Sequence, residues 1–192
     1  MPDYVILTDS SADLSAEMVR EAGVTVLPLS FTIQGGTYQN TPDNREMDPA
    51  LFYDMLRAGE LATTSAVNVA AYTEAVEPLL QAGKDVLILA FSSGLSTTCN
   101  SAEVAAEELR EQYPQRKLYV VDTLCASLGQ GLLVWLAARE QKKGRSIEEV
   151  RDWAEAHKQA VCHQFTVQDL KFLKRGGRIT ATTAVLGSML QI

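Results

Sequence analysis

The sequence predicts an α/β fold: a parallel-sheet, Rossmann-like, three-layer N-terminal domain, followed by the start of a second, smaller α/β domain. Short apolar segments alternate with helical patterns along most of the chain, as expected of strand–helix–strand units with parallel strands. The 192 residues are 46% hydrophobic and 21% charged, which is typical of a chain with a buried core. Because a domain averages about 150 residues, this length fits one domain and part of another.

Three short apolar segments are expected to form buried strands, because they are rich in Val, Ile and Leu and too short for buried helices. These segments are Tyr4–Leu7, Val86–Phe91 and Leu118–Val121. A further strand is expected over Val24–Ile33, ending at the turn formed by Gly35 and Gly36. Together these segments supply the strands of the predicted sheet.

Four helices are expected from apolar residues spaced three and four apart and from the residues that end helices. They cover Asn68–Gln81, Ser96–Tyr113, Ala126–Gln141 and Ser146–Lys158. The first three stop before Gly83, Pro114 and Gly144. Ser146 and Glu149 have the spacing of a capping box, which marks the start of the fourth helix.

From about Phe165 the chain becomes basic and glycine-bearing, and no further strand–helix unit follows. We therefore expect residues 1–163 to form the α/β domain and residues 164–192 to begin a second domain that this chain does not complete. A domain of about thirty residues usually needs disulfides, metals or a partner for stability. The sequence thus predicts an N-terminal fragment of a longer protein.

Several functional classes are disfavoured by composition. No apolar run approaches the ~20 residues of a membrane-spanning helix, and a formal net charge of -7 disfavours nucleic-acid binding. The N-terminus carries Asp3 and no basic region, unlike a secretory signal, so a cytoplasmic location is expected. The three cysteines form no CxxC pair and are expected to be reduced, and the two histidines lack a carboxylate cluster. No metal and no nucleotide cofactor is predicted.

Hydroxyl side chains follow several of the predicted strands, where open parallel sheets bind ligands. The candidate binding residues are Ser10 and Ser11 after the first strand, Ser92, Ser93 and Gly94 after the second, Thr123 after the third, and Thr64 in a further hydroxyl turn, Thr63–Ser65. Hydroxyls and free N–H groups at helix N-termini suit a carboxylate or a phosphate, and a glycine allows close approach. The same residue types are also preferred helix caps, so capping alone explains these turns about equally well.

Catalytic motifs are weaker. There is no GxSxG sequence, and both histidines lie near the expected domain boundary instead of at a strand end. Asp9 ends the first strand, but Ser11 stands where haloacid-dehalogenase-like phosphatases have a second aspartate. Gly129-x-Gly131 lacks a third glycine and falls in a helical pattern, so helix packing explains it better than dinucleotide binding. The alternative function is a small-molecule phosphate- or acyl-processing hydrolase that uses Asp9 or Ser93.

A basic motif, Leu173–Ile179, allows two interpretations. It can be a helix end at which glycine caps the last carbonyls and basic residues complement the helix dipole. Alternatively, Arg175 or Arg178 pairs with an anionic ligand or with an acidic partner, for which guanidinium is well shaped. The residues alone leave both interpretations open.

Six segments together resemble the DegV family in order and spacing along essentially the whole chain. They are TDSSADLS at Thr8–Ser15, TTS at Thr63–Ser65, SSGLS at Ser92–Ser96, VVDT at Val120–Thr123, SLGQG at Ser127–Gly131 and LKRGGRI at Leu173–Ile179. Members of that family are described as bacterial fatty-acid-binding proteins, in which an α/β N-terminal domain and a smaller C-terminal domain enclose the acyl chain. Some present the bound fatty acid to a kinase that phosphorylates its carboxylate, and then carry the acyl phosphate.

The resemblance implies a carrier without catalytic activity that binds a long-chain fatty acid with its carboxylate near Thr64 and the Ser92–Gly94 turn. It puts Arg175 on the family's basic motif, a candidate surface for the fatty-acid kinase. The stretches Ser65–Asn68 and Ser96–Cys99 depart from the TSQP-like and SGTY-like patterns of the family, so the pocket wall is expected to differ. Family members also continue further than this chain, and the missing part is expected to complete the acyl pocket.

Overall fold

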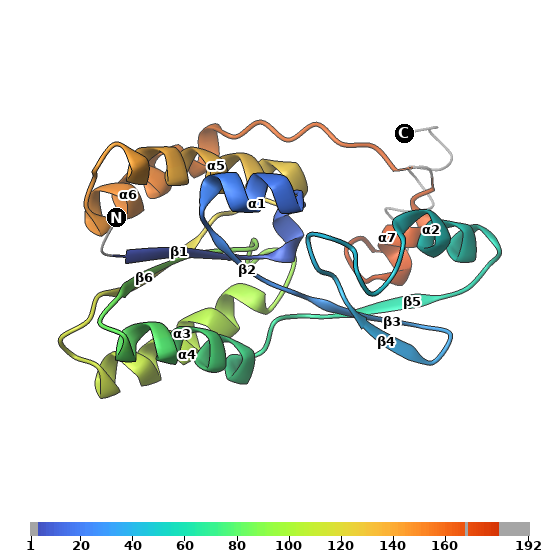
Figure 1. The fold of residues 1–192 in the computed structure, drawn as a ribbon. Helices are drawn as coiled ribbons and strands as arrows, with labels where there is room; N and C mark the ends of the chain where they lie inside the picture. The colour runs from blue at the N-terminus through green and yellow to red at the C-terminus, as the bar shows by residue number, and fades with distance from the viewer. Residues whose placement is uncertain (1–3, 168, 181–192) are drawn as a thin grey trace. The chain divides into compact units, whose positions relative to one another are not determined.

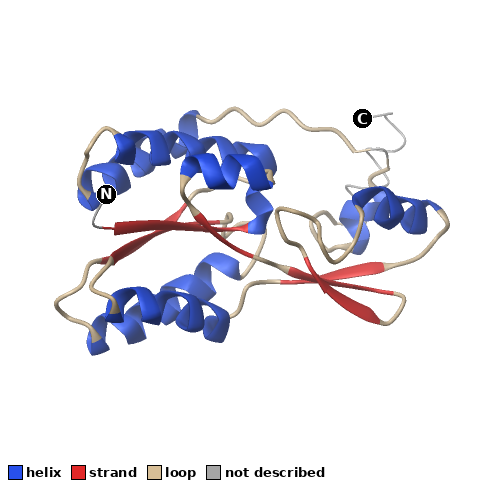
Figure 2. Ribbon diagram, viewed as in Figure 1, coloured by secondary structure: helices blue, strands red, loops and turns tan. Residues whose placement is uncertain are grey.

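The computed structural model describes residues 4–167 and 169–180, and the chain divides into two compact units, residues 1–162 and 163–192. The first unit contains a parallel sheet with helices and a smaller antiparallel sheet (Figures 1 and 2). The described part of the second unit contains one short helix, α7 (Lys171–Arg175). Among the described residues, no helix combines the length and apolar character needed to cross a membrane.

The larger sheet has four parallel strands in the order β2-β1-β6-β7, which confirms the predicted α/β fold. Its strands are β1 (Tyr4–Asp9), β2 (Thr25–Leu27), β6 (Asp85–Ala90) and β7 (Leu118–Asp122). From β1 the chain first adds β2 on one side and later β6 on the other. Ligands of open parallel sheets bind at such a reversal, outside the carboxyl ends of the strands.

Helices cover both faces of this sheet and complete the three layers (Figure 2). One face carries α1 (Ala16–Ala22), α5 (Ser127–Lys142) and α6 (Ile147–His157), and the other carries α3 (Val69–Gln81) and α4 (Thr98–Gln112). Side chains alternate along each strand, so Ile6 and Leu89 enter the first core whereas Leu7 and Ile88 enter the second. Both faces are therefore dry, which accounts for the apolar strand sequences.

The four predicted helices are confirmed, each with ends within two residues of those expected. Asn68 caps α3 by accepting the Ala71 N–H at 2.8 Å. The capping box of α6 is also confirmed: Ser146 Oγ accepts the Glu149 N–H at 3.2 Å, and Glu149 Oε2 accepts the Ser146 N–H at 2.7 Å. The N-termini of α3 and α6 could be predicted because a helix cap depends on residues that are close in sequence.

The prediction of one strand over Val24–Ile33 is wrong. The segment forms two strands in different sheets, β2 and β3 (Ser30–Ile33), separated at Pro28. Proline has no N–H group to donate within a sheet, so Pro28 can follow β2, an edge strand, but cannot belong to β3, which is central in its own sheet. The next N–H group, that of Leu29, donates instead to Ser10 Oγ at 2.9 Å.

The second sheet is antiparallel, in the order β4-β3-β5, with β4 (Gly36–Gln39) and β5 (Ala62–Ser65). Gln34 and Gly35 join β3 to β4 with φ values of 49° and 78°, the left-handed conformations of a two-residue hairpin. Helix α2 (Pro49–Arg57) contacts this sheet through an edge-on ring pair of Phe31 and Phe52, with centroids 5.1 Å apart. The Thr63–Ser65 segment therefore lies in a strand, and its interpretation as a turn is wrong.

The three cysteines are expected to differ in reactivity. Cys99 and Cys125 are buried and Cys162 is exposed. Burial raises the pKa of the Cys99 thiol to about 12 and also raises the pKa of the Cys125 thiol, which disfavours the reactive thiolate at both positions. We expect one thiol to react quickly with a disulfide reagent in the native protein and all three after denaturation. The substitution Cys162→Ser should remove the fast reaction, and two fast thiols in the native protein would contradict this packing.

Candidate functional site

Asp9 ends β1 at the point where the strand order reverses. Its side chain is fully buried, and its Oδ2 accepts hydrogen bonds from the Phe91 N–H at 2.8 Å and from Gln130 Nε2 at 3.3 Å. Its Oδ1 accepts the Ser11 N–H at 3.1 Å. Burial raises the pKa of the Asp9 carboxyl, and the hydrogen bonds from its neighbours oppose that shift. The carboxyl group thus joins β1 to β6 and α5, an arrangement that does not present a nucleophile to a substrate.

The turn Ser92–Gly94, which follows β6, is tied to the loop that follows β7. Ser92 is buried, its N–H donates to the Cys125 carbonyl at 3.1 Å, and its Oγ accepts the Gly94 N–H at 3.3 Å. Ser93 is exposed, and its N–H donates to Asp122 Oδ1 at 3.2 Å. No described residue forms a hydrogen bond with the Ser93 hydroxyl, which is therefore available to a ligand.

Thr123 is fully buried in the loop after β7. Its hydroxyl donates to the Ala90 carbonyl at 2.7 Å and accepts the Cys125 N–H at 3.3 Å. These bonds hold the loop to the end of β6. The Thr123 hydroxyl, a predicted ligand contact, thus already forms hydrogen bonds with the backbone.

The two serines after β1 differ in their surroundings. Ser10 is buried, and its Oγ accepts the Leu29 N–H at 2.9 Å, which joins the end of β1 to the chain between the two sheets. Ser11 is half-buried and donates its N–H to Asp9. Both residues therefore have a part in holding the end of β1, whether or not a ligand binds there.

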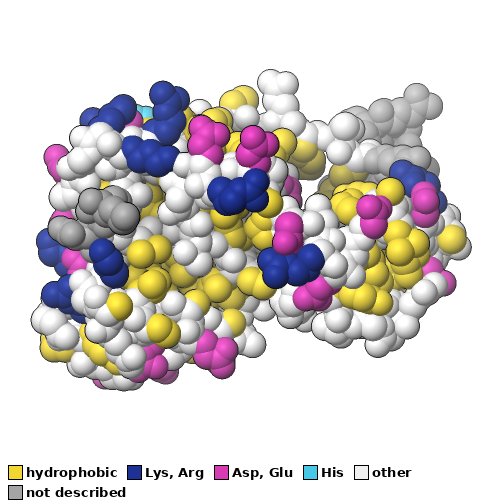
Figure 3. Space-filling view, viewed as in Figure 1, with side chains coloured by type: hydrophobic (Ala, Val, Ile, Leu, Met, Phe, Trp, Pro, Cys, Tyr) yellow, Lys and Arg dark blue, Asp and Glu magenta, His cyan; other side chains and the backbone are white. Residues whose placement is uncertain are grey.

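Thr64 lies on β5 at a cavity of about 350 Å³ between the antiparallel sheet and α2. We call it the aromatic cavity, because Phe31, Phe52 and Tyr53 line it with Thr64. Hydrophobic side chains are exposed over this sheet and helix in Figure 3. No described residue forms a hydrogen bond with the Thr64 hydroxyl. A free hydroxyl beside apolar rings can hold the polar head of an amphiphile while the rings contact its chain.

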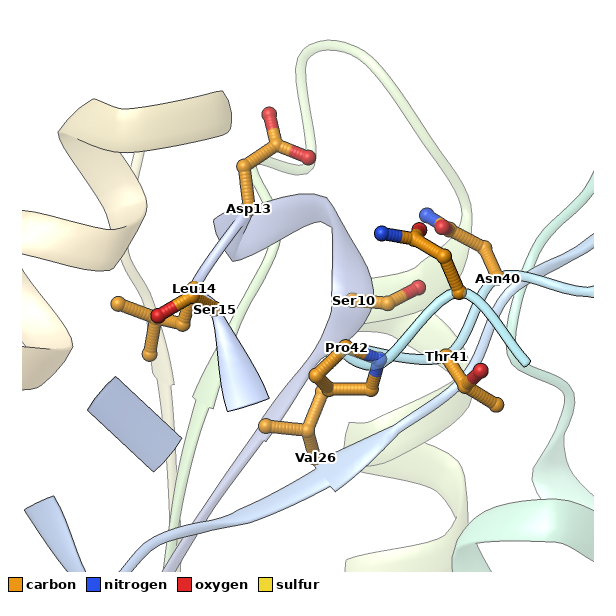
Figure 4. Close-up of a pocket in the computed structure, with 9 residues that line it drawn as sticks. Ser10, Asp13, Leu14, Ser15, Val26, Asn40, Thr41 and Pro42 are labelled. Atoms are coloured by element: carbon orange, nitrogen blue, oxygen red, sulfur yellow. The ribbon is translucent and has the colours of Figure 1, made fainter. Parts of the chain in front are cut away.

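A polar cavity of about 280 Å³ adjoins the aromatic cavity and shares Asp13, Asn40 and Asn44 with it. Figure 4 shows Ser10, from the end of β1, across this cavity from Asn40 and Thr41. Among the described residues that line it, Asp13 is the charged one. Asp13 closely follows β1 and also lines the aromatic cavity, so this cavity lies near the carboxyl end of β1.

Arg175 and Arg178 belong to the second unit and are exposed. Arg175 is the last residue of α7, and Gly177, at φ 74°, follows the helix end in the left-handed conformation. This confirms the predicted helix end with a glycine beyond it. Contacts of Arg175 or Arg178 with an anionic ligand or a partner stay predictions.

The structure brings the predicted residues together in two groups. The loop after β7 joins Ser92, Ser93 and Thr123, and neighbouring cavities contain Ser10 and Thr64. Among the described residues that line the aromatic cavity, none comes from the Ser92–Gly94 turn, so one site formed by all these hydroxyls stays a prediction.

Sequence reasoning missed two features of this region. The hydrogen bonds accepted by Asp122 were not foreseen, although the VVDT motif contains this residue directly after a predicted strand. The aromatic lining around Thr64 was also missed, because no periodic pattern marks Phe52 and Tyr53 as neighbours of Phe31.

Comparison with known families gives a match along almost the entire chain. A family model described as an uncharacterised protein of the DegV family matches residues 3–192. A DegV domain-containing protein of Clostridium perfringens is 46% identical over 192 residues, which are 100% of this chain and 66% of that protein. A Lactococcus lactis relative is 34% identical over 98% of this chain and 65% of its own length. The chain thus spans about two thirds of the length of these relatives.

Solved structures have the same fold. A DegV family protein from Thermus thermophilus, described by its fatty-acid binding, has a TM-score of 0.81 and 35% identity, over 97% of this chain and 64% of that one. A fatty-acid-binding protein from Bacillus subtilis has a TM-score of 0.78 and 28% identity, over 97% and 64%. A stearic-acid-binding protein from Eubacterium ventriosum has a TM-score of 0.78 and 28% identity, over 93% and 61%.

Proposed function

This chain belongs to the DegV family, and from that premise we propose that it binds a long-chain fatty acid. The observation that carries the proposal is the similarity, with a TM-score of 0.81 over 97% of the chain, to a structure described by its fatty-acid binding. The described residues add a free hydroxyl, that of Thr64, in a cavity with three aromatic side chains. A methylene group removed from water contributes about 0.8 kcal/mol, so an acyl chain gains most of its affinity from such apolar walls.

In this proposal the hydroxyls of Thr64 and Ser93 donate hydrogen bonds to the fatty-acid carboxylate, and the Ser92–Gly94 turn shapes that end of the site. Two observations support the assignment: both side chains are exposed, and both hydroxyls are free of described partners. A hydrogen bond to a charged group contributes about 1.5–3 kcal/mol, enough to select an acid over an uncharged lipid of equal length.

We further propose that the protein is a cytoplasmic carrier, not an enzyme, and that it presents the carboxylate to a separate fatty-acid kinase. The occupied carboxyl group of Asp9 supports a carrier over a hydrolase. We propose that residues 164–192 begin a second domain, because the chain divides at 162/163 and its relatives are longer.

Mass spectrometry of lipid extracted from the purified native protein tests the fatty-acid proposal. We expect a long-chain fatty acid near one molecule per chain, and a clear decrease in a variant carrying Thr64→Val and Ser93→Ala. Recovery of a phosphorylated metabolite, or hydrolase activity that Asp9→Asn abolishes, would replace the carrier with an enzyme. A protein that folds cooperatively but takes up no added oleate or palmitate would also contradict the proposal.

Arg175→Ala should separate lipid binding from presentation to the kinase. Because Arg175 is exposed on α7, in a different unit from Thr64 and Ser93, the fatty-acid affinity should stay within about twofold of wild type. Kinase-dependent formation of acyl phosphate should fall at least about tenfold, since a guanidinium at an interface is hard to replace. Lys174→Ala in the same helix is the matched control. A loss of lipid affinity with normal phosphorylation would instead put Arg175 in the acyl pocket.

A further inference from the structure

We infer that Asp122 is the positioning residue of the carboxylate site: its side chain fixes the Ser92–Gly94 turn so that the Ser93 hydroxyl faces the ligand. The inference rests on the proposed fatty-acid function. It adds a residue that does not touch the ligand itself and acts through the backbone of Ser93.

The geometry places one carboxylate oxygen between two loops. Asp122 is the last residue of β7 and pairs with Ala90, the last residue of β6. From there its Oδ1 accepts the Ser93 N–H at 3.2 Å and the Leu124 N–H at 3.0 Å. A single half-buried side chain thus joins the turn after β6 to the loop after β7.

The backbone of Leu124 supports this role. Leu124 has φ 53°, in the left-handed region that a bulky side chain rarely adopts. Such a conformation persists only where the surroundings hold it, and it is common at ligand-binding loops. Here the surroundings include the hydrogen bond from the Leu124 N–H to Asp122, so the same carboxylate holds the strained residue and the candidate ligand-binding turn.

The rest of the connection does not depend on Asp122. The Thr123 hydroxyl donates to the Ala90 carbonyl at 2.7 Å, and the Ser92 N–H donates to the Cys125 carbonyl at 3.1 Å. These bonds keep both loops on the sheet when the Asp122 side chain is removed. Loss of Asp122 should therefore loosen Ser93 locally without unfolding the domain.

The negative charge of Asp122 gives a second way to test its positioning role, through its effect on the affinity for an anionic ligand. A carboxylate beside a site for another carboxylate repels the ligand, so Asp122 is unfavourable there except for the bonds it accepts. Asparagine presents a carboxamide oxygen at the same position and can accept both N–H groups without the negative charge. Asp122→Asn should therefore keep the turn in place and bind an anionic ligand at least as tightly as wild type.

Calorimetric titration with oleate, together with amide hydrogen exchange, tests the inference. We expect Asp122→Ala to weaken oleate binding roughly tenfold and to speed exchange at the Ser93 amide. Asp122→Asn should restore slow exchange and equal or exceed wild-type affinity, with the gain shrinking at about 0.5 M salt. If the alanine variant unfolds, Asp122→Val, which fills similar space without an acceptor, takes its place.

Asp85→Ala is the matched control, because Asp85 Oδ1 accepts the Lys117 N–H at 2.9 Å at the opposite end of the same two strands. It should leave oleate affinity and Ser93 exchange unchanged. If wild type and Asp85→Ala bind oleate and Asp122→Ala binds equally well, the inference is overturned while the fatty-acid function stands. If wild type binds no oleate, the proposed function fails, and normal Ser93 exchange in Asp122→Ala would separately overturn the ordering role.

Discussion

Replacing Thr64 by valine and Ser93 by alanine together is expected to weaken fatty-acid binding by about 3–6 kcal/mol, at least a hundredfold in affinity. Each substitution removes one hydroxyl with no described partner, and each lost bond to a carboxylate costs about 1.5–3 kcal/mol. Valine has nearly the shape of threonine and suits a strand, so β5 should be preserved. The affinity for oleate, measured by titration calorimetry, gives the result directly.

Thr63→Val is the matched control for this effect. Thr63 precedes Thr64 on β5, and successive side chains of a strand point to opposite faces, so it is absent from the described lining of the aromatic cavity. Its substitution should leave affinity unchanged, and all variants should keep the wild-type melting temperature within a few degrees, as expected for exposed positions. Unchanged affinity in the double variant would mean that these hydroxyls have structural roles alone.

The two single variants decide whether Thr64 and Ser93 serve one head group. Two hydroxyls that hold the same carboxylate are coupled, so the cost of the double variant should depart from the sum of the two single costs by at least about 0.5 kcal/mol. Strictly additive effects would indicate that the two side chains act at separate places. Ser93 is not among the described residues that line the aromatic cavity. The single variants therefore test whether its hydroxyl and that of Thr64 bind the same head group.

The parallel sheet and its helices could be predicted because their signals are local. Buried strands are continuous apolar runs, and the starts of α3 and α6 depend on Asn68 and on the Ser146–Glu149 pair, each cap within three residues of its partner. The antiparallel sheet could not be predicted in the same way. Its strand β5 is exposed and carries Thr and Ser, which are as common in turns as in exposed strands. In the sequence, Pro28 was the one sign that the chain leaves the first sheet before it enters the second.

The candidate site was less predictable than the fold, because hydroxyl groups have the same sequence signature whether they bind a ligand or the backbone. Thr123 and Ser93 both follow parallel strands, yet the Thr123 hydroxyl is buried against Ala90 and the Ser93 hydroxyl is exposed. The difference depends on which loop each residue meets in the folded chain. Asp122 stands in the VVDT motif without a role assigned from the sequence, and in the structure it accepts the Ser93 N–H.

Close packing between α5 and the end of β1 is the physical reason for glycine at position 131. A Cβ atom at Gly131 would lie 2.4 Å from the Ala12 carbonyl oxygen, which is backbone and cannot turn away. Because α5 lies this close to the end of β1, the preceding residue, Gln130, can donate from Nε2 to Thr8 Oγ1 at 3.1 Å and to Asp9 Oδ2 at 3.3 Å. This contact confirms helix packing as the explanation of Gly131 in the Gly129-x-Gly131 motif, and it also supports the strand end beside the candidate site.

Gly131→Ala should therefore destabilise the protein by about 1–3 kcal/mol, because α5 must move away from Ala12. The sign of this change in stability is informative. Inside an unconstrained helix alanine is favoured over glycine by about 1 kcal/mol, so helix propensity alone would make Gly131→Ala stabilising. Leu132→Ala, at a 49% exposed position in the same turn, is the control and should change the free energy of unfolding by no more than about 0.5 kcal/mol. Urea unfolding measures both. If Gly131→Ala is as stable as wild type, α5 can shift at little cost, and the bonds from Gln130 to β1 do not depend on close packing.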